Sequence, residues 1–235
     1  DIHHHFNRSY YPDRDEYLDA MVKIAEEYKV NKFCLSGLGE CYGQYGNEDV
    51  EYAFKKLPDL IIGFAYIDLD VEKPEKIKEF KERGFKGVKF INPLKNYDDE
   101  SYFKIYEEVT KQKMVCLFHT GIVAHSLCDK EKHTSGDKMR PVRLEAIART
   151  FPELKIIGAH FGWPWYREAN AVMGANENIY FDTTGGTLAN LPEPFKSLIF
   201  EPVKFEKFIF GTDSLAKDFK IPYEKCKKFF RELNP

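Results

Sequence analysis

Residues 60–91 read LIIGFAYIDLDVEKPEKIKEFKERGFKGVKFI, and this stretch decides the predicted fold. Leu60–Ile67 is an almost uninterrupted apolar run, which is typical of a β-strand buried on both faces. A helix over Pro74–Arg83 follows, opened by a proline and ended by a glycine, as helices often are. Phe85–Ile91 is a second strand-like run. The stretch therefore predicts a strand–helix–strand unit with parallel strands.

The same alternation runs through the rest of the chain. The other predicted strands are Ile2–Phe6, Lys32–Leu38, Met114–His119, Leu154–His160, Ile179–Asp182 and Lys207–Phe210. The other predicted helices are Arg14–Tyr28, Glu48–Lys56, Asp98–Lys113, Pro141–Thr150, Tyr166–Met173, Pro194–Phe200 and Pro222–Leu233. Eight strands alternating with helices predict a closed (β/α)8 TIM barrel, as a single domain over residues 1–235. An open doubly wound sheet is the alternative, but no predicted strand is followed by Gly-x-Gly-x-x-Gly.

Composition restricts the class of protein. The 235 residues are 43% hydrophobic and 31% charged, as in an ordinary globular protein with a sizeable core. The net charge of −3, with both signs interspersed, argues against a nucleic-acid or membrane partner, so we expect a small-molecule substrate. No apolar run approaches the ~20 residues that cross a bilayer. Five cysteines without Cys-x-x-Cys or zinc-ribbon spacing fit a reducing compartment, and we expect a cytoplasmic protein.

The first six residues, DIHHHF, carry two histidines on one face of the first predicted strand. His3 and His5 are two residues apart and therefore share a face, whereas His4 points the other way. Two neutral imidazoles on one face make half of a site for zinc or a similar ion. The alternative is a remnant of an expression tag. Against it, this stretch has only three histidines, and they lie inside the apolar run after an aspartate.

Polar residues also end other predicted strands, where barrels of this type have their active sites. They are Lys89, late in the fourth strand, and His119, His160, Asp182 and Asp213 at the ends of later strands. One such histidine alone is usually a hydrogen-bonded core residue. Here, His3, His5 and His119 offer three nitrogens and Asp213 a carboxylate, which leaves one position open for water, as in catalytic zinc sites. His160 suits either a fourth nitrogen ligand or a general acid/base.

Five motifs extend this pattern over the whole chain: Asp-x-His-x-His in the first strand, Phe118–Gly121, Ile156–Gly162, Tyr180–Gly185 and Phe210–Asp213. Together they resemble the amidohydrolase superfamily. The nearest branch is the amidohydrolase-related (amidohydrolase 2) branch, which includes aminocarboxymuconate-semialdehyde decarboxylase, resorcylate decarboxylases and several lactone or carboxylic-acid hydrolases. The resemblance covers the chain in order, so it is specific for fold and metal and only weakly specific for the reaction.

The resemblance implies a role for each matched position. His3, His5, His119 and Asp213 are expected to hold one divalent ion, zinc or alternatively manganese. His160 is expected to polarise or shuttle the proton of the metal-bound water or substrate. Lys89 lies near the place of the carbamylated lysine that bridges two metals in some members, and this two-metal site is the less favoured alternative. Asp1 is expected to be a structural hydrogen-bond acceptor. Many relatives dimerise, so a homodimer is a further expectation.

The loops suggest candidates for substrate binding. Residues 38–48 and 120–140 are expected to form lids over the site. Arg140 and Arg167 are candidates for gripping a substrate carboxylate, because arginine binds carboxylates bidentately. Trp163 is a candidate wall for a planar or apolar substrate, although packing against the next helix explains it equally well.

Three functions fit this pattern. The first is a metal-dependent hydrolase of a small ester, lactone or amide, in which Asp213 takes up the proton of the attacking water and His160 steadies the oxyanion. The second is a non-oxidative decarboxylase (carboxy-lyase) of a small unsaturated or aromatic acid, in which His160 protonates the carbon. The third is a non-enzymatic metal-binding scaffold, which the full ligand set disfavours. The sequence does not separate the first two.

Overall fold

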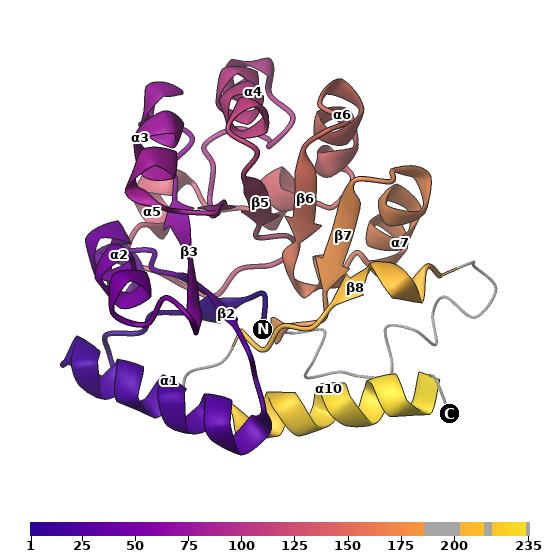
Figure 1. Cartoon of the computed structure of the whole chain (residues 1–235). Helices are drawn as coiled ribbons and strands as arrows, with labels where there is room; N and C mark the ends of the chain where they lie inside the picture. The colour runs from indigo at the N-terminus through magenta and orange to yellow at the C-terminus, as the bar shows by residue number, and fades with distance from the viewer. Residues whose placement is uncertain (186–202, 214–217, 234–235) are drawn as a thin grey trace.

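The computed structural model describes residues 1–185, 203–213 and 218–233 (Figure 1). Eight parallel strands form one curled sheet whose order follows the chain, β1 to β8. This confirms the predicted (β/α)8 barrel and all eight predicted strands, each within its predicted range. The strands are β1 His4–His5, β2 Phe33–Ser36, β3 Ile61–Tyr66, β4 Gly87–Phe90, β5 Val115–Phe118, β6 Lys155–Gly158, β7 Ile179–Asp182 and β8 Phe208–Ile209.

Two backbone hydrogen bonds bring the end of the sheet back to its beginning. The amide of Ile2 donates to the carbonyl of Phe210 at 2.9 Å, and the amide of Asp213 donates to the carbonyl of His3 at 2.8 Å. These bonds flank β1 and β8, whose own ladders are only two residues long. They close the sheet into a barrel and place Asp213 directly beside His3.

Helices follow the strands around the outside of the barrel (Figure 1). They are α1 Arg14–Tyr28, α2 Asn47–Lys56, α3 Glu75–Arg83, α4 Phe103–Lys111, α5 Asp129–Lys132, α6 Arg143–Thr150, α7 Tyr166–Ala175 and α10 Lys220–Leu233. The predicted helix over Asp98–Lys113 is divided, because Asp99 accepts from the amide of Ser101 and starts a separate 3-10 turn before α4. The short α5 was not predicted, and the predicted helix Pro194–Phe200 lies outside the described residues.

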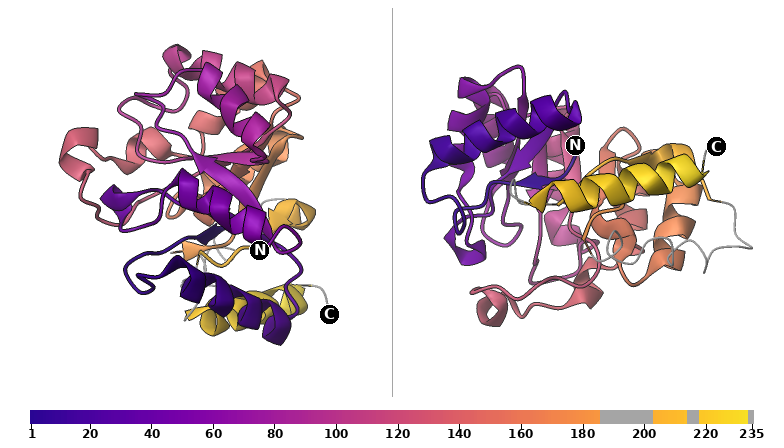
Figure 2. Two further views of the ribbon diagram at one scale, coloured as in Figure 1. Left: turned by 60° about the vertical axis from the view of Figure 1, so that its left-hand side comes forward. Right: turned by 90° about the horizontal axis from the view of Figure 1, so that it is seen from below.

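Helices α1 and α10 come from opposite ends of the chain, and the end of α1 meets the beginning of α10 (Figures 1 and 2). Tyr28 of α1 contacts Tyr223 of α10 with ring centroids 4.8 Å apart, and the Tyr223 hydroxyl donates to the Tyr28 carbonyl at 3.2 Å. The pair covers the outside of the barrel where β1 meets β8, next to the closing hydrogen bonds. None of the described helices is long and apolar enough to cross a membrane.

The barrel interior holds a small apolar cluster of Phe64, Leu117, Ile157 and Ala159, separate from the main core between strands and helices. Side chains alternate between the two faces of a strand, so the residues two positions from these also face the interior. His119 follows Leu117 by two, and Lys89 is the register partner of Leu117 on β4. The apolar cluster therefore fills one end of the interior, and polar strand-end residues occupy the other.

Candidate metal centre

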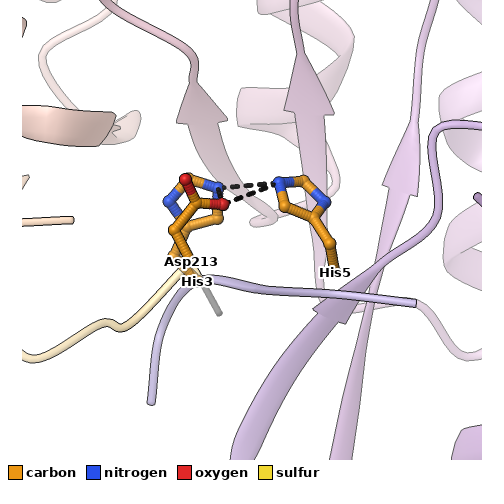
Figure 3. Close-up of side chains that lie close together, drawn as sticks. All are labelled: His3, His5 and Asp213. Atoms are coloured by element: carbon orange, nitrogen blue, oxygen red, sulfur yellow. Dashed lines mark hydrogen bonds and ion pairs between the residues drawn. The ribbon is translucent and has the colours of Figure 1, made fainter. Parts of the chain in front are cut away.

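His3, His5 and Asp213 meet inside the barrel mouth (Figure 3). The Nε2 atoms of His3 and His5 are 3.0 Å apart, and Asp213 Oδ1 lies 3.5 Å from the first and 3.3 Å from the second. Ligand atoms of a tetrahedral site with bonds of about 2.1 Å are about 3.4 Å from one another. The spacing of the three atoms therefore matches one face of such a site.

The outer nitrogens of both histidines have partners that orient the rings. His3 Nδ1 donates to Asp182 Oδ2 at 2.9 Å, and both side chains are fully buried. His5 Nδ1 lies 3.2 Å from the Ser36 hydroxyl. With protons on the Nδ1 atoms, both Nε2 atoms present lone pairs to each other, an arrangement that a cation between them stabilises. A carboxylate behind a ligating histidine is also the usual support of a metal site. The donor set thus fits a divalent ion.

His4 points away from this centre, as the strand alternation predicts. Its Nε2 lies 2.8 Å from the Tyr17 hydroxyl of α1, and its ring packs on Phe33. Asp1 is a structural acceptor, as expected, because its carboxylate receives the amide of His3 at 3.0 Å and the Thr212 hydroxyl at 2.6 Å. These contacts hold β1 and the strand-end loop after β8 in place.

Lys89 also reaches the centre. Its Nζ is 2.9 Å from His3 Nε2, and the side chain is fully buried. Burial lowers the pKa of Lys89 to about 8, although the carboxylates of Asp213 and Asp182 oppose this shift. Burial also raises the pKa of Asp213 to about 7, opposed by the Lys89 cation. The bridging role of Lys89 in a two-metal site stays a prediction.

His119 and His160 form a second, adjoining pair. His160 Nε2 lies 3.1 Å from His119 Nδ1, and the other nitrogen of His119, Nε2, is buried with no hydrogen-bond partner among the described residues. His119 is not part of the tight group of His3, His5 and Asp213. Its ligand role stays a prediction, and the unpartnered Nε2 is the atom that would serve it.

His160 is held in an uncommon conformation. Its φ is +65°, in the left-handed region that non-glycine residues rarely adopt, and its amide donates to Asp182 Oδ1 at 2.7 Å. The ring Nδ1 lies 2.7 Å from the Thr184 hydroxyl and 3.8 Å from Asp213 Oδ2. Burial lowers the pKa of His160 to about 4, so the ring is neutral near pH 7. His160 therefore lies beside Asp213, and its role as a proton carrier stays a prediction.

A cavity of about 870 Å³ opens above these residues. His5, His119, His160 and Asp213 are among its lining residues. Its walls are mainly apolar or aromatic and include Leu38, Tyr42, Ile91, Ile122, Val123, Leu127 and Trp163. No lysine or arginine belongs to the described lining.

Of the three residues predicted to bind substrate, only one lines the cavity. Trp163 lines the cavity, as expected of a wall residue. Arg140 does not, because it is an ion-pair partner of Glu168 and Asp137. Arg167 lines a separate hollow with Trp165 and Tyr166. The two arginines were predicted to bind substrate because of their charge. Whether they reach the barrel mouth depends on the fold of the loop and helix that carry them. Their predicted contact with a substrate carboxylate has no support in this geometry.

Sequence reasoning missed three polar residues around the site. They are Ser36 behind His5, Tyr42 in the wall, and Thr184 behind His160. Thr184 lies in the Asp-Thr-Thr-Gly motif after β7, and Ser36 ends β2. The positions of Ser36 and Thr184 at or just after strand ends were the available signal, but serine and threonine are too common there to be singled out, and Tyr42 lies in the 3-10 turn Glu40–Tyr42 with no such signal.

Both predicted lid loops line the cavity, and a disulfide joins them. Cys41 of the first loop and Cys128 of the second are bonded, with Cα atoms 5.7 Å apart, and the amide of Leu127 donates to the Cys41 carbonyl at 3.1 Å. Lys132 anchors the second loop further along, with ion pairs to Asp68 and Asp70. The sequence did not predict the disulfide, because its cysteines are 87 residues apart. The cytoplasmic location stays a prediction.

Reducing this disulfide is expected to lower the free energy of unfolding by about 2–4 kcal/mol, because a long closed loop restricts the unfolded chain. Urea denaturation with and without a thiol reductant measures the change. The double variant Cys41→Ser/Cys128→Ser should show the lower stability in both conditions. An equal response to reductant in wild type and the double variant would contradict the assignment.

Comparison with known proteins agrees with this fold. The structure resembles an uncharacterised TIM-barrel protein from Bordetella bronchiseptica, with TM-score 0.72, 18% identity, and coverage of 97% of this chain and 90% of that one. It also resembles a probable 2-pyrone-4,6-dicarboxylic acid hydrolase from Acinetobacter baumannii, with TM-score 0.66, 16% identity and coverage of 99% and 91%. A manganese-containing dihydroxybenzoic acid decarboxylase from Polaromonas sp. JS666 gives TM-score 0.67, 15% identity and coverage of 97% and 90%.

These three identities are low, so the likeness establishes the fold and not the reaction. The sequence matches no curated protein. It does match the family model Amidohydro_2, described as amidohydrolase, over residues 37–235. The matched region contains His119, His160 and Asp213, and the first strand with His3 and His5 lies before it. Because the match spans most of the chain, the chain belongs to the amidohydrolase family.

Proposed function

We propose that this chain is a metal-dependent carboxy-lyase that removes carbon dioxide from a small unsaturated or aromatic acid. The distribution of polarity in the cavity carries this proposal. The candidate metal ligands and His160 lie at the barrel mouth, whereas the described walls are mainly apolar and lack lysine and arginine, with polar side chains in the lid loops at Glu40, Gln44, His125 and Ser126. A buried carboxylate without a charged partner is costly. The substrate's carboxylate therefore lies at the polar end, where the chemistry occurs, and its apolar body lies against the walls.

His3, His5 and Asp213, with His119 Nε2, would hold one divalent ion, zinc or manganese. When bound, such an ion supplies a Lewis acid that binds and polarises a carboxylate. The support is the spacing of the three ligand atoms and the unpartnered nitrogen of His119. The decarboxylase from Polaromonas contains manganese, which is in keeping with this assignment.

The chain's own groups handle the proton. Asp213 Oδ2 lies 3.8 Å from His160 Nδ1. We assign to these residues the delivery of one proton to the substrate carbon. The new C–H bond forms, the bond to the carboxylate breaks, and its electron pair returns to the π system as carbon dioxide leaves. The apolar walls exclude water from this step, and Trp163 faces a planar substrate.

Hydrolysis of a small lactone or ester is the second candidate. The same two groups can take a proton from water instead of giving one to carbon, with His160 steadying the oxyanion. The structural likeness to a probable 2-pyrone-4,6-dicarboxylic acid hydrolase supports hydrolysis as a candidate function of this chain. A dicarboxylate, however, would place a second charge against walls whose described residues include no lysine or arginine.

The test is a panel of aryl and unsaturated monocarboxylates, lactones and simple esters, offered to zinc- and manganese-loaded protein. Release of labelled carbon dioxide from a carboxyl-labelled acid supports the carboxy-lyase. Incorporation of oxygen from labelled water into a ring-opened or cleaved product, without carbon dioxide, would replace it with the hydrolase.

Among turned-over acids, those with a second carboxylate on the ring are expected to have kcat/KM lower by at least about tenfold, because an unpaired buried charge costs more than ~1.4 kcal/mol. Ile122 lines the cavity and is 45% exposed, so Ile122→Arg should supply a cation and reduce the difference. Val71→Arg is the control, since Val71 is exposed and is not among the lining residues. Equal selectivity in wild type and Ile122→Arg would argue against an apolar wall as the specificity determinant.

A further inference from the structure

The hydroxyl of Thr184 lies at the junction of the two histidine pairs. Its Oγ1 donates to Asp182 Oδ1 at 2.6 Å, and it lies 2.7 Å from His160 Nδ1 and 3.2 Å from His3 Nδ1. Thr184 and Asp182 are fully buried. The amide of Thr184 also donates to Asp182 Oδ1, at 3.1 Å, so the residue is held at both its backbone and its side chain.

A hydroxyl has only one proton to donate, and an ionised carboxylate can only accept. Because the Thr184 proton is directed to Asp182, the oxygen must accept from His160, and the His160 proton therefore resides on Nδ1. His3 Nδ1 has its own acceptor, Asp182 Oδ2, at 2.9 Å. One carboxylate and one hydroxyl thus orient a candidate metal ligand and the candidate proton carrier together.

The consequence extends to His119. With the His160 proton on Nδ1, its Nε2 carries a lone pair and faces His119 Nδ1 at 3.1 Å. His119 Nδ1 must then donate, which leaves the lone pair of His119 on Nε2. That atom is the buried nitrogen without a partner among the described residues. The direction of one hydroxyl proton therefore determines which nitrogen His119 presents.

Gly185 packs against the same ring. A Cβ atom added there would lie 2.7 Å from His160 Nδ1, and the residue has a φ of +59°. The segment after β7 therefore supports the His160 ring by close backbone approach and by the adjacent hydroxyl. The close approach of Gly185 restricts rotation of the His160 ring and so helps to maintain its 2.7 Å hydrogen bond to Thr184.

We propose that Thr184 is a positioning residue that sets the tautomers of His160 and His119, so that His119 keeps its lone pair on the buried, unpartnered Nε2 and His160 holds its proton on Nδ1. The effect on turnover rests on the proposed function, whereas the effect on the two tautomers does not. Removal of a supporting partner of this kind typically costs about 10- to 100-fold in metal affinity or activity.

The test compares Thr184→Val, which keeps the shape and loses the hydroxyl, with Thr184→Ser, which keeps the hydroxyl. Thr183→Val is the matched control, because Thr183 is an adjacent, fully buried threonine whose hydroxyl lies 3.4 Å from Cys226 Sγ and not at the site. Nitrogen-15 NMR of histidine-labelled protein, free of metal and loaded with zinc, reports which ring nitrogen carries the proton. Zinc affinity, kcat and KM are measured on the same variants.

We expect Thr184→Val to give mixed tautomers for His160 and His119, zinc affinity weaker by about tenfold or more, and a lower kcat with little change in KM. Thr184→Ser should restore all three, and Thr183→Val should match wild type. Wild-type tautomer signals in Thr184→Val, or the same losses in Thr183→Val, would overturn the proposal. If wild type releases no carbon dioxide from any acid, the proposed function fails, and the tautomers and zinc affinity still test Thr184.

Discussion

His5→Ala is expected to abolish metal binding and turnover together. His5 Nε2 lies 3.0 Å from His3 Nε2 and 3.3 Å from Asp213 Oδ1, so its removal deletes one of three convergent ligand atoms. A catalytic site of this kind has only three or four protein ligands, and loss of one lowers affinity by orders of magnitude. Metal content after dialysis, measured by atomic emission, should fall from about one ion per chain to near zero, with activity at background.

The control for His5→Ala is His133→Asn. His133 is exposed, and its φ of +45° is one that asparagine tolerates, so this change removes a histidine from the surface without straining the backbone. It should retain metal and activity. Full metal content in His5→Ala would place the ion elsewhere and remove the main support for the candidate centre.

Replacing His160 is expected to separate metal binding from catalysis. His160 contacts His119, Thr184 and Asp182, and it lies 3.8 Å from Asp213 Oδ2. A positioned proton carrier contributes on the order of 10²–10⁴ in rate. The variant should therefore keep most of its metal and lose about that factor in kcat.

The choice of substitution at residue 160 matters. Its φ is +65°, where alanine is strained and asparagine is tolerated, so His160→Asn removes the imidazole with least cost to the fold. Thermal unfolding of the variant checks that the barrel is intact. Loss of metal in parallel with activity would reassign His160 as a ligand and favour a two-metal site with Lys89. Unchanged activity would make His160 structural.

Local sequence pattern determined the scaffold. The prediction for α1, Arg14–Tyr28, matches the structure at both ends, and so does β7, Ile179–Asp182. Periodicity is a property of neighbouring residues, so it can be read without knowing what the segment packs against. The shared face of His3 and His5 and the opposite direction of His4 follow from the same rule, since strand side chains alternate. The strand-end positions of His119, His160 and Asp213 then placed the site at the barrel mouth.

Only the tertiary structure decided which residues form ion pairs, disulfides and hydrogen bonds with one another. The pairing of Arg140 with Glu168, the bond between Cys41 and Cys128, and the bridge from Thr184 to His160 join residues 24 to 87 positions apart. Nothing in the local pattern ranks one acidic partner, thiol or hydroxyl over another at such separations. These contacts depend on which loops and strand ends the closed barrel brings within a few ångströms, and hydrogen bonds and ion pairs form only at that range.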